Sequence, residues 1–470
     1  MNLLRAAVLL ALAPTVALAE TPVSMETLHQ AGGDTPWSLR VLSFFGALTL
    51  IGLCWLGSSN RRAVRWRPVV WGMLLQVILG LIVLSPQIGQ LFFTVVDTGV
   101  TRLLSFAESG ASFVFQSLVP HEVTTVDLRT HGSSTGVYVG TISPVLKTFA
   151  FWILPSIIFF SALMTVLYHI GIMQLFVRGT SWIMQRTMRT SGAETLSTAA
   201  NIFLGQTEAP LCVRPYLDRM TPSELHAIMV GGFATVAGGV LAAYVGFLKD
   251  QIPDIAGHLV TASIMGAPAT LALSKLVLPE TERPVTQDDS RSALVESPDA
   301  NVVESLARGC SEGMVLAVNV AAMLIGFIAM VALVNWGLHG AGSLVGLDLS
   351  LERLLGWLFA PIAFLMGIPW HEALVVGRLL GEKLVLTELV AYLHLGEIMK
   401  SAEPLSQRTA VITSYALCGF ANFASIGIQV GGIGGLAPLR RAEFARLGVR
   451  AMLTGAMCTV IMGAVVGMLL

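Results

Sequence analysis

The sequence has 470 residues, of which 54% are apolar and only 12% are charged, and its formal net charge is −1. The charged share is about half that of typical soluble domains, so water is not the main solvent of this chain. Binding to nucleic acid needs a clustered basic face, and none is visible. The composition therefore indicates an integral membrane protein and argues against a nucleic-acid partner.

The first 19 residues have the features of a secretory signal peptide. Arg5 precedes an apolar stretch that ends near Val16, and small residues at 17–19 precede Glu20. An uncleaved additional helix is the alternative for this segment. Cleavage would leave the mature N-terminus outside the cytoplasm.

Runs of apolar residues recur at close to the length that is needed to cross about 30 Å of hydrocarbon. A single soluble core would not repeat such runs so regularly, so they predict a multi-spanning, all-α membrane protein. The runs lie at residues 41–57, 69–85, 146–168, 226–248, 259–278, 313–338 and 451–470.

Arginines gather in particular loops, and loops rich in Lys and Arg usually face the cytoplasm. We therefore expect these loops to be cytoplasmic, in agreement with an N-terminus on the other side. The arginines are Arg61, Arg62, Arg65, Arg67, Arg178, Arg186, Arg189, Arg214, Arg219, Arg440, Arg441, Arg446 and Arg450.

The longest polar stretch, residues 280–304, divides the chain. It is rich in Asp, Glu, Ser, Thr and Pro, and such a segment cannot bury enough apolar surface to fold by itself. We interpret it as a cytoplasmic linker. A second polar insert at 122–141 is interpreted as an outward-facing loop. Residues 39–140 are assigned to N-terminal transmembrane and interfacial helices.

The same order of motifs occurs on both sides of the linker. Before it, GQTEAPL begins at Gly205 and GGFATVAGGV begins at Gly231; after it, LTELVAY begins at Leu386 and CGFANFASIGI begins at Cys418. Thr-Glu thus precedes Gly-Phe-Ala in both halves, which indicates an internal repeat. The two repeats are assigned to residues 141–279 and 305–470.

Two glutamates lie in apolar segments, where a carboxylate costs about 2.5–3.5 kcal/mol and usually faces a cavity. Glu208 lies between Gly205 and Pro210, and Glu388 lies in a short, interrupted segment. Unwound backbone is tolerated in a membrane only where protein, water or ligand satisfies it. We therefore predict two re-entrant hairpins, at residues 195–218 and at about 355–395.

The polar residues of these motifs carry amide, hydroxyl and carboxylate groups, and none is Lys or Arg, so a carboxylate or phosphate substrate fits poorly. A neutral solute rich in hydroxyl groups and amide-like edges fits better, with Phe420 as an apolar or stacking surface. Asn422 and Ser425 are three residues apart and are expected on one helix face. The polar candidates are Gln206, Thr207, Glu208, Glu388, Asn422 and Ser425.

Several segments resemble the concentrative nucleoside transporter family, over nearly the whole chain after the first 19 residues. The resemblance implies about eight transmembrane helices plus two re-entrant helical hairpins in an inverted repeat, arranged as a scaffold and an elevator-type transport domain. It also implies a homotrimer in a bacterial inner membrane, no enzymatic activity, and Na⁺ as the coupling ion without other cofactors. The segments are SSNRRAV from Ser58, GQTEAPL from Gly205, GGFATVAGGVLA from Gly231, LLGWLFAPIAFLMGIPW from Leu354 and SYALCGFANFASI from Ser414.

The same resemblance implies roles for individual residues, with nucleosides of the uridine, cytidine and adenosine class as substrates. The nucleobase would be held by Gln206, Thr207, Glu208 and Val240. The ribose would be held by Glu388, Asn422 and Ser425, with Phe420 alongside. A sodium ion would sit near Asn201, Leu204, Thr235 and Val236.

The motif around Glu388 departs from the family pattern. Thr387 stands where the family has Asn, Leu389 where it has Phe, and Arg378 where a glutamate is common. Glu382 follows Arg378 by four residues, so we expect the two charges to compensate one another. These changes leave Glu388 in place but affect the shape of the ribose subsite, and they leave the choice between purines and pyrimidines open.

Three alternatives stay open on the sequence. A buried glutamate could carry a proton, which would make the coupling ion H⁺, although the neutral oxygens of Asn201 and Thr235 favour sodium. Glu208 and Glu388 could form an acid/base pair of an intramembrane enzyme, but no nucleophile or metal motif accompanies them. A passive gate or receptor is the third alternative, which accumulation against a gradient would exclude.

Overall fold

The computed structural model describes residues 36–85, 88–115, 123–126, 133–136, 149–287, 299–343, 346 and 349–470. The expected signal peptide lies outside the described residues, as do parts of both polar inserts. Within the described part the chain is helical except for two short strands, β1 (Val123–Val126) and β2 (Ser133–Gly136). They pair antiparallel, with Val123 opposite Gly136. The insert interpreted as a loop therefore contains a β-hairpin.

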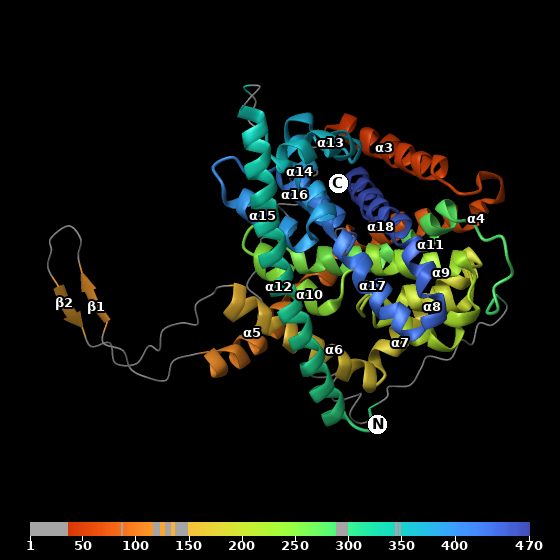
Figure 1. The fold of residues 1–470 in the computed structure, drawn as a ribbon, viewed down its shortest axis with the longest axis horizontal. Coiled ribbons are helices and arrows are strands. Elements are labelled where there is room, and N and C mark those ends of the chain that lie inside the picture. Colours follow the sequence, from red (N-terminus) through yellow and green to blue (C-terminus); the bar gives the residue numbers. More distant parts are fainter. Residues whose placement is uncertain are drawn as a thin grey trace.

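In the part of the chain that the structure describes, three α-helices precede the polar insert at 122–141 (Figure 1). Both α3 and α4 are long and apolar enough to cross a membrane, whereas α5 is amphipathic. The arginine-rich turn between α3 and α4 includes the 3₁₀-helix η1 (Arg61–Ala63). The helices are α3 (Trp37–Leu56), α4 (Trp66–Val83) and α5 (Ile88–Phe115).

The region before the linker contains helices that are repeatedly broken. A bend of 74° separates α6 from α7 at Gly171, which has a left-handed φ of 84°. A second break, at residues 235–237, separates α9 from α10. The elements are the π-helix η2 (Phe149–Ile153), α6 (Leu154–His169), α7 (Ile172–Met188), α8 (Gly192–Ala200), the 3₁₀-helix η3 (Ala209–Arg219), α9 (Pro222–Ala234), α10 (Gly238–Leu248) and α11 (Ile255–Val277).

The region after the linker begins with one very long helix, α12, which runs across the molecule beside α6 (Figure 1). A bend of 117° separates α13 from α14. The elements are α12 (Val302–Ser343), α13 (Leu351–Leu365), α14 (Trp370–Val385), α15 (Glu388–Lys400), α16 (Gln407–Leu417), α17 (Phe423–Leu436), the 3₁₀-helix η4 (Pro438–Arg440) and α18 (Arg441–Leu469).

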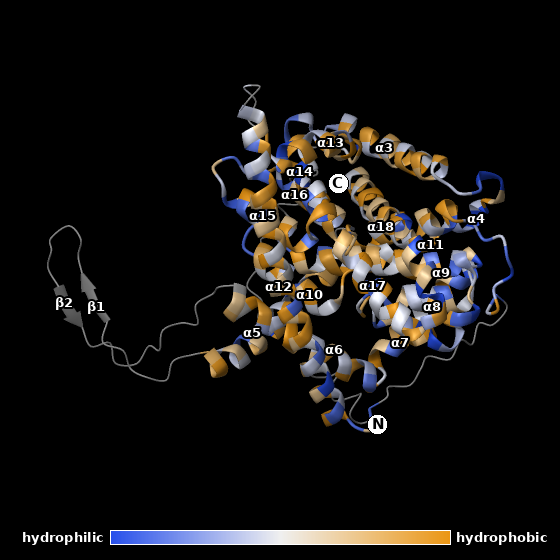
Figure 2. Ribbon diagram, viewed as in Figure 1, coloured by the Kyte–Doolittle hydropathy of each residue, from blue (hydrophilic) through white to orange (hydrophobic). Residues whose placement is uncertain are grey.

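Six helical stretches in the described part are long and apolar enough to cross a membrane, and eight if each of the two bent pairs forms one span. The interior is built mainly from α9, α11, α16 and α18, whereas α3 and α12 expose many apolar side chains. Figure 2 shows hydrophobic residues along both α3 and α12. The fold is therefore a helical bundle whose outer surface suits a bilayer rather than water.

Buried polar side chains cap the first turns of α8 and α9 and so fix where these helices begin. Ser191 and Glu194 form a capping box at the start of α8, and Thr221 and Glu224 form one at the start of α9. The Lys275 ammonium of α11 lies 2.7 Å from a carboxylate oxygen of Glu194, and the Ser191 hydroxyl donates to Glu224. These contacts join α8, α9 and α11 at one end of the bundle.

Candidate functional site

Four helix interruptions meet at one cavity of about 130 Å³. They separate α8 from η3, α9 from α10, α14 from α15, and α16 from α17. Two precede the linker and two follow it, so each half of the chain contributes a pair. Unwound segments leave backbone groups free for a ligand, which makes this cavity the candidate site.

The structure places all eight candidate substrate residues in the lining of this cavity. They come from the four interruptions and the helix starts beside them. No Lys or Arg lines the cavity, so its charge comes from two glutamates. The eight residues are Gln206, Thr207, Glu208, Val240, Glu388, Phe420, Asn422 and Ser425.

Glu388 is the first residue of α15, and its carboxylate is held on both sides. The Thr387 hydroxyl caps the helix by accepting from Val390 N, so threonine fills a role that asparagine also performs. Tyr244 donates its hydroxyl to Glu388 Oε1 at 2.9 Å, and Asn422 Nδ2 donates to Oε2 at 2.9 Å. The carboxylate is almost fully buried, yet both of its oxygens are satisfied.

Asn422 is the N-cap of α17 rather than a residue within that helix. Its Oδ1 accepts from the Ser425 backbone N–H at 2.8 Å, while its Nδ2 donates to Glu388. A carboxylate can only accept and a backbone N–H can only donate, so the amide orientation is fixed at both ends. The expectation that Asn422 and Ser425 share a helix face is replaced by a direct capping contact.

Gln206 is oriented by a residue that was not among the predicted site residues. Gln429 of α17 is fully buried, and its Nε2 donates to Met229 O at 3.2 Å and to Gln206 Oε1 at 3.1 Å. Because a backbone carbonyl only accepts, Gln429 must present its amide nitrogen there. Gln206 Nε2 is then turned towards Ser425 Oγ, 3.4 Å away, so Gln206 offers a donor on that side.

A glycine leaves the room for this pair of amides. A Cβ atom at Gly232 would lie 2.6 Å from Gln429 Nε2 and 2.8 Å from Gln206 Cβ. Any side chain at position 232 would therefore displace one of the two glutamines.

Glu208 also lines the cavity, and its side chain is exposed. The Gly205 N–H donates to Glu208 Oε2 at 3.2 Å. A neighbouring cavity of about 120 Å³ shares Glu208 and also includes Arg308 and Glu312 of α12, which form an ion pair at 2.9 Å. The remaining wall of the first cavity is an apolar stripe of α12 formed by Leu316, Val320 and Leu324.

The four candidate ion ligands lie where α8 ends and where α9 is interrupted. Asn201 caps the end of α8 and is fully buried, and both polar atoms of its side chain lack a hydrogen-bond partner among the described residues. A Cβ atom at Gly231 would lie 2.8 Å from Asn201 Nδ2, and the Thr235 hydroxyl donates to Gly231 O. Val236 is buried at the break and Leu204 is half-buried.

The chemistry of this second group suits a weakly bound monovalent cation. Its side-chain oxygens are neutral, and the helix ends supply backbone carbonyls, which are the ligands that sodium prefers in broken helices. In the part of the chain that the structure describes, no group of three or more His, Cys, Asp or Glu side chains could hold a metal ion. A buried amide without partners is costly unless something binds it.

The expected charge compensation beside the site is confirmed. Arg378 Nε lies 2.7 Å from Glu382 Oε1, and His394 Nδ1 lies 2.8 Å from Glu382 Oε2. Glu382 is buried on α14 and His394 is on α15, so the carboxylate joins α14 to the helix that begins at Glu388. The spacing of four residues identified the first contact, and only the fold shows the second.

Family models match three successive parts of the chain. Residues 45–118 match the N-terminus, and residues 258–467 the C-terminus, of the Na⁺-dependent nucleoside transporter model. Residues 150–251 match a model described as nucleoside recognition.

Curated relatives match over nearly the same region. The sodium/nucleoside cotransporter 1 of Mus musculus is 40% identical over 443 residues, which cover 92% of this chain and 64% of the relative. The chain therefore spans slightly less than two thirds of that relative. The uncharacterized transporter YutK of Bacillus subtilis is 42% identical over 424 residues, which cover 90% of this chain and 98% of the relative.

Solved structures match in three dimensions as well. CNTnw in an inward-facing, substrate-bound state has a TM-score of 0.80 at 38% identity, covering 92% of this chain and 97% of that one. A CNTnw variant in an outward-facing state has a TM-score of 0.81 at 39% identity, covering 92% and 99%. The chain therefore belongs to the Na⁺-dependent nucleoside transporter family, a family of membrane transporters and not of enzymes.

Proposed function

We propose that this protein imports nucleosides by symport with Na⁺ across a bacterial inner membrane, as a multi-pass homotrimer. The observation that carries the proposal is the cavity between the two halves, in which carboxylate, amide and hydroxyl groups are held in fixed orientations without a cation. A neutral solute with hydroxyl groups and a polar ring edge complements such a lining.

The ribose is assigned to the side of the cavity that Glu388 occupies. Two adjacent ribose hydroxyls can donate to the carboxylate, whose oxygens already accept from Tyr244 and Asn422 but retain further lone pairs. Ser425 completes this side, and Phe420 supplies an apolar surface. Hydrogen bonds to a charged acceptor are worth about 1.5–3 kcal/mol each, so this side supplies much of the affinity.

The nucleobase is assigned to the side formed by Gln206, Thr207, Glu208 and Val240. Gln206 offers a donor because Gln429 occupies its Oε1, and Glu208 offers an acceptor. A base edge with an acceptor next to a donor complements this pair. Uracil, cytosine and adenine each have such an edge, and so does guanine at O6 and N1–H, so this pair accepts both pyrimidines and purines.

Sodium is assigned to the group of Asn201, Leu204, Thr235 and Val236. The support is the buried Asn201 side chain whose polar atoms have no partner among the described residues. Binding there would draw the end of α8 towards the break after α9, and thereby position Gln206 and Glu208. Each charge that moves inward releases about 2.3 kcal/mol per 100 mV of membrane potential. Coupling to H⁺ through a buried glutamate is the alternative.

Alternating access would move the broken helices along α12. Leu316, Val320 and Leu324 form a smooth apolar stripe with no hydrogen bond to the site, so the cavity can slide past it at small cost. Solved relatives are described in inward-facing, outward-facing and intermediate states. We assign α8–α10 and α14–α17 to the moving part, and α6 and α12 to the scaffold.

The test is uptake of radiolabelled uridine and adenosine into proteoliposomes that contain the purified protein. Inward gradients of Na⁺ and of H⁺ are imposed separately, with equal gradients of K⁺ as the control. Accumulation beyond equilibration with Na⁺ alone supports the proposal. Accumulation with H⁺ alone would overturn the ion assignment, and the absence of uptake and binding of either nucleoside would overturn the substrate class.

A further inference from the structure

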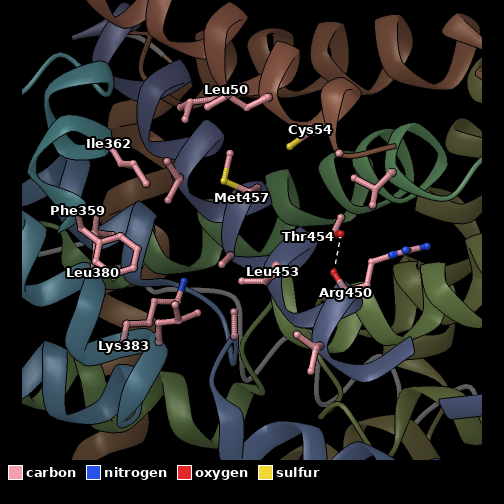
Figure 3. Close-up of a pocket in the computed structure, with 18 of the residues that line it drawn as sticks. Leu50, Cys54, Phe359, Ile362, Leu380, Lys383, Arg450, Leu453, Thr454 and Met457 are labelled. Atoms are coloured by element: carbon pink, nitrogen blue, oxygen red, sulfur yellow. Dashed lines mark hydrogen bonds between the residues drawn. The ribbon is translucent and has the colours of Figure 1, made fainter. Parts of the chain in front are cut away.

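A cavity of about 910 Å³ lies away from the candidate site, between α3, α13, α14 and α18 (Figure 3). Its walls are mainly apolar, with Leu50 and Cys54 from α3, Leu380 from α14 and Met457 from α18. Leu53, Val449 and Leu453 also line it, and about half of each side chain is exposed. Because these three belong to helices that are long enough to span a membrane, the opening faces lipid.

The charged residues of this cavity all have the same sign. Lys383, Arg446 and Arg450 line it, and no Asp or Glu does. Both arginines are exposed, lie four residues apart on α18, and form no ion pair within the part of the chain that the structure describes. Lys383 is buried and donates to Ala416 O at 2.9 Å and to Thr459 Oγ1 at 2.7 Å. The cavity therefore combines an apolar chamber with uncompensated positive charge.

The dimensions match a lipid in one leaflet. The lining of α18 extends from Arg446 to Val460, which is about 21 Å of helix at 1.5 Å per residue. Half of a hydrocarbon core is about 15 Å thick, which leaves the arginines at the level of the head groups. The arginine pattern places this end of α18 on the cytoplasmic side, where anionic lipids bind basic pockets between helices.

The chain's own N-terminal segment is a poor occupant. The cavity is lined by the last turns of α3, up to Gly57, whereas residues 1–35 join that helix near Trp37. These ends of the 20-residue helix are about 30 Å apart, which is the thickness of the hydrocarbon core, so the segment would have to pass back through the membrane to reach the cavity. We propose that the cavity binds an anionic phospholipid, with an acyl chain among the apolar walls and the phosphate on Arg446 and Arg450.

An occupant would contact residues of an interruption that also lines the candidate site. Ala416 and Ala421 line the lipid cavity, while Phe420 and Asn422 of the same interruption line the smaller one. Lys383 already holds the Ala416 carbonyl at this point. The bound lipid therefore braces the break between α16 and α17 and stabilises the folded protein.

The test is lipid retention by the purified full-length protein, measured by native mass spectrometry after exchange into nanodiscs of phosphatidylcholine with or without phosphatidylglycerol. The charge variant is Arg446→Gln/Arg450→Gln. Its matched control is Arg62→Gln/Arg186→Gln, which removes equal charge from exposed positions on the same side and outside the cavity. A third variant, Leu453→Trp, fills the opening and keeps both arginines.

The wild type and the control are expected to retain phosphatidylglycerol in preference to phosphatidylcholine and to unfold at a higher temperature in its presence. The charge variant should lose this preference by about 25-fold, because each arginine contributes roughly fivefold near an anionic lipid. Leu453→Trp should lose retention of both lipids. Equal losses in the charge variant and the control, or full retention by Leu453→Trp, would overturn the proposal. Leu453→Trp alone decides the matter if the charge variant does not fold.

Discussion

Helices α11 and α12 are both long and apolar, but α11 lies inside the protein and α12 lies on its outer surface. In α11, 89% of the most apolar 18-residue stretch is buried, against 18% in α12, although α12 is the more apolar of the two. Helix α11, the buried one, carries the polar residues His258, Thr261 and Lys275, all of which are buried in the protein. In a bilayer the outside is the least polar environment, so polar groups concentrate where the protein can satisfy them.

The first prediction tests this comparison on the outside of α12. Ile325 is 73% exposed near the middle of the helix, and Ile325→Lys should destabilise the folded membrane protein by about 3 kcal/mol. A soluble protein would tolerate such a surface change, whereas here the side chain faces lipid or another copy. The measurement is the yield of folded protein and its unfolding in detergent. Ile325→Val is the control, and a yield of Ile325→Lys equal to that of the control would contradict the comparison.

The second prediction concerns the polar interior. Glu388→Gln should reduce kcat/KM for uridine about 100-fold, because the ribose hydroxyls lose a charged acceptor and the hydrogen bonds from Tyr244 and Asn422 weaken. Uptake into proteoliposomes gives the measurement. Glu397→Gln changes an exposed glutamate of the same helix and should leave uptake unaltered. Equal effects of the two substitutions on uptake would show that Glu388 does not bind the substrate.

The third prediction separates the ion from the substrate. Asn201→Leu keeps the size of a buried side chain but removes its oxygen, so the Na⁺ concentration for half-maximal uptake should rise about tenfold, the effect of losing about 1.4 kcal/mol. Uridine affinity at saturating Na⁺ should change much less. Thr413→Val, at another buried hydroxyl without a partner among the described residues, is the control. An unchanged Na⁺ dependence in Asn201→Leu would refute the ion assignment.

The smallest expected effect is on base selectivity. In Gln429→Glu the new side chain cannot donate to Gln206 Oε1, so the Gln206 amide should turn and present an acceptor beside Glu208. Uridine KM should rise about fivefold while guanosine, whose edge offers two donors, gains relative to it. Gln429→Met, which leaves Gln206 free to adopt both orientations, should show a smaller shift. Parallel changes for both nucleosides in Gln429→Glu would show that Gln429 acts only on packing.

Much of the fold and the site could be predicted, because membrane solvation leaves strong signals in a sequence. Apolar runs of spanning length, glutamates inside them and the paired motifs predicted broken helices and seven of the residues that line the cavity, and the family resemblance added Val240. The family assignment is confirmed.

Other features could not be predicted because they depend on contacts between distant segments. The antiparallel pairing of β1 with β2 lies in a polar insert without a clear strand pattern. The helices that meet beside Glu388 are α14 and α15, and the range of about 355–395 also takes in most of α13. Tyr244 and Gln429 lie 144 and 223 residues from the side chains that they contact.

The sequence by itself determined the solvent of the protein, the motifs in which the interruptions of the site lie and the chemical types present in the site, since each of these is local. The tertiary structure alone decided which way the amides of Gln206 and Asn422 point, because that depends on Met229 O, Glu388 and the Ser425 N–H. Hydrogen-bond direction is a property of pairs of groups, and only the fold brings these pairs together.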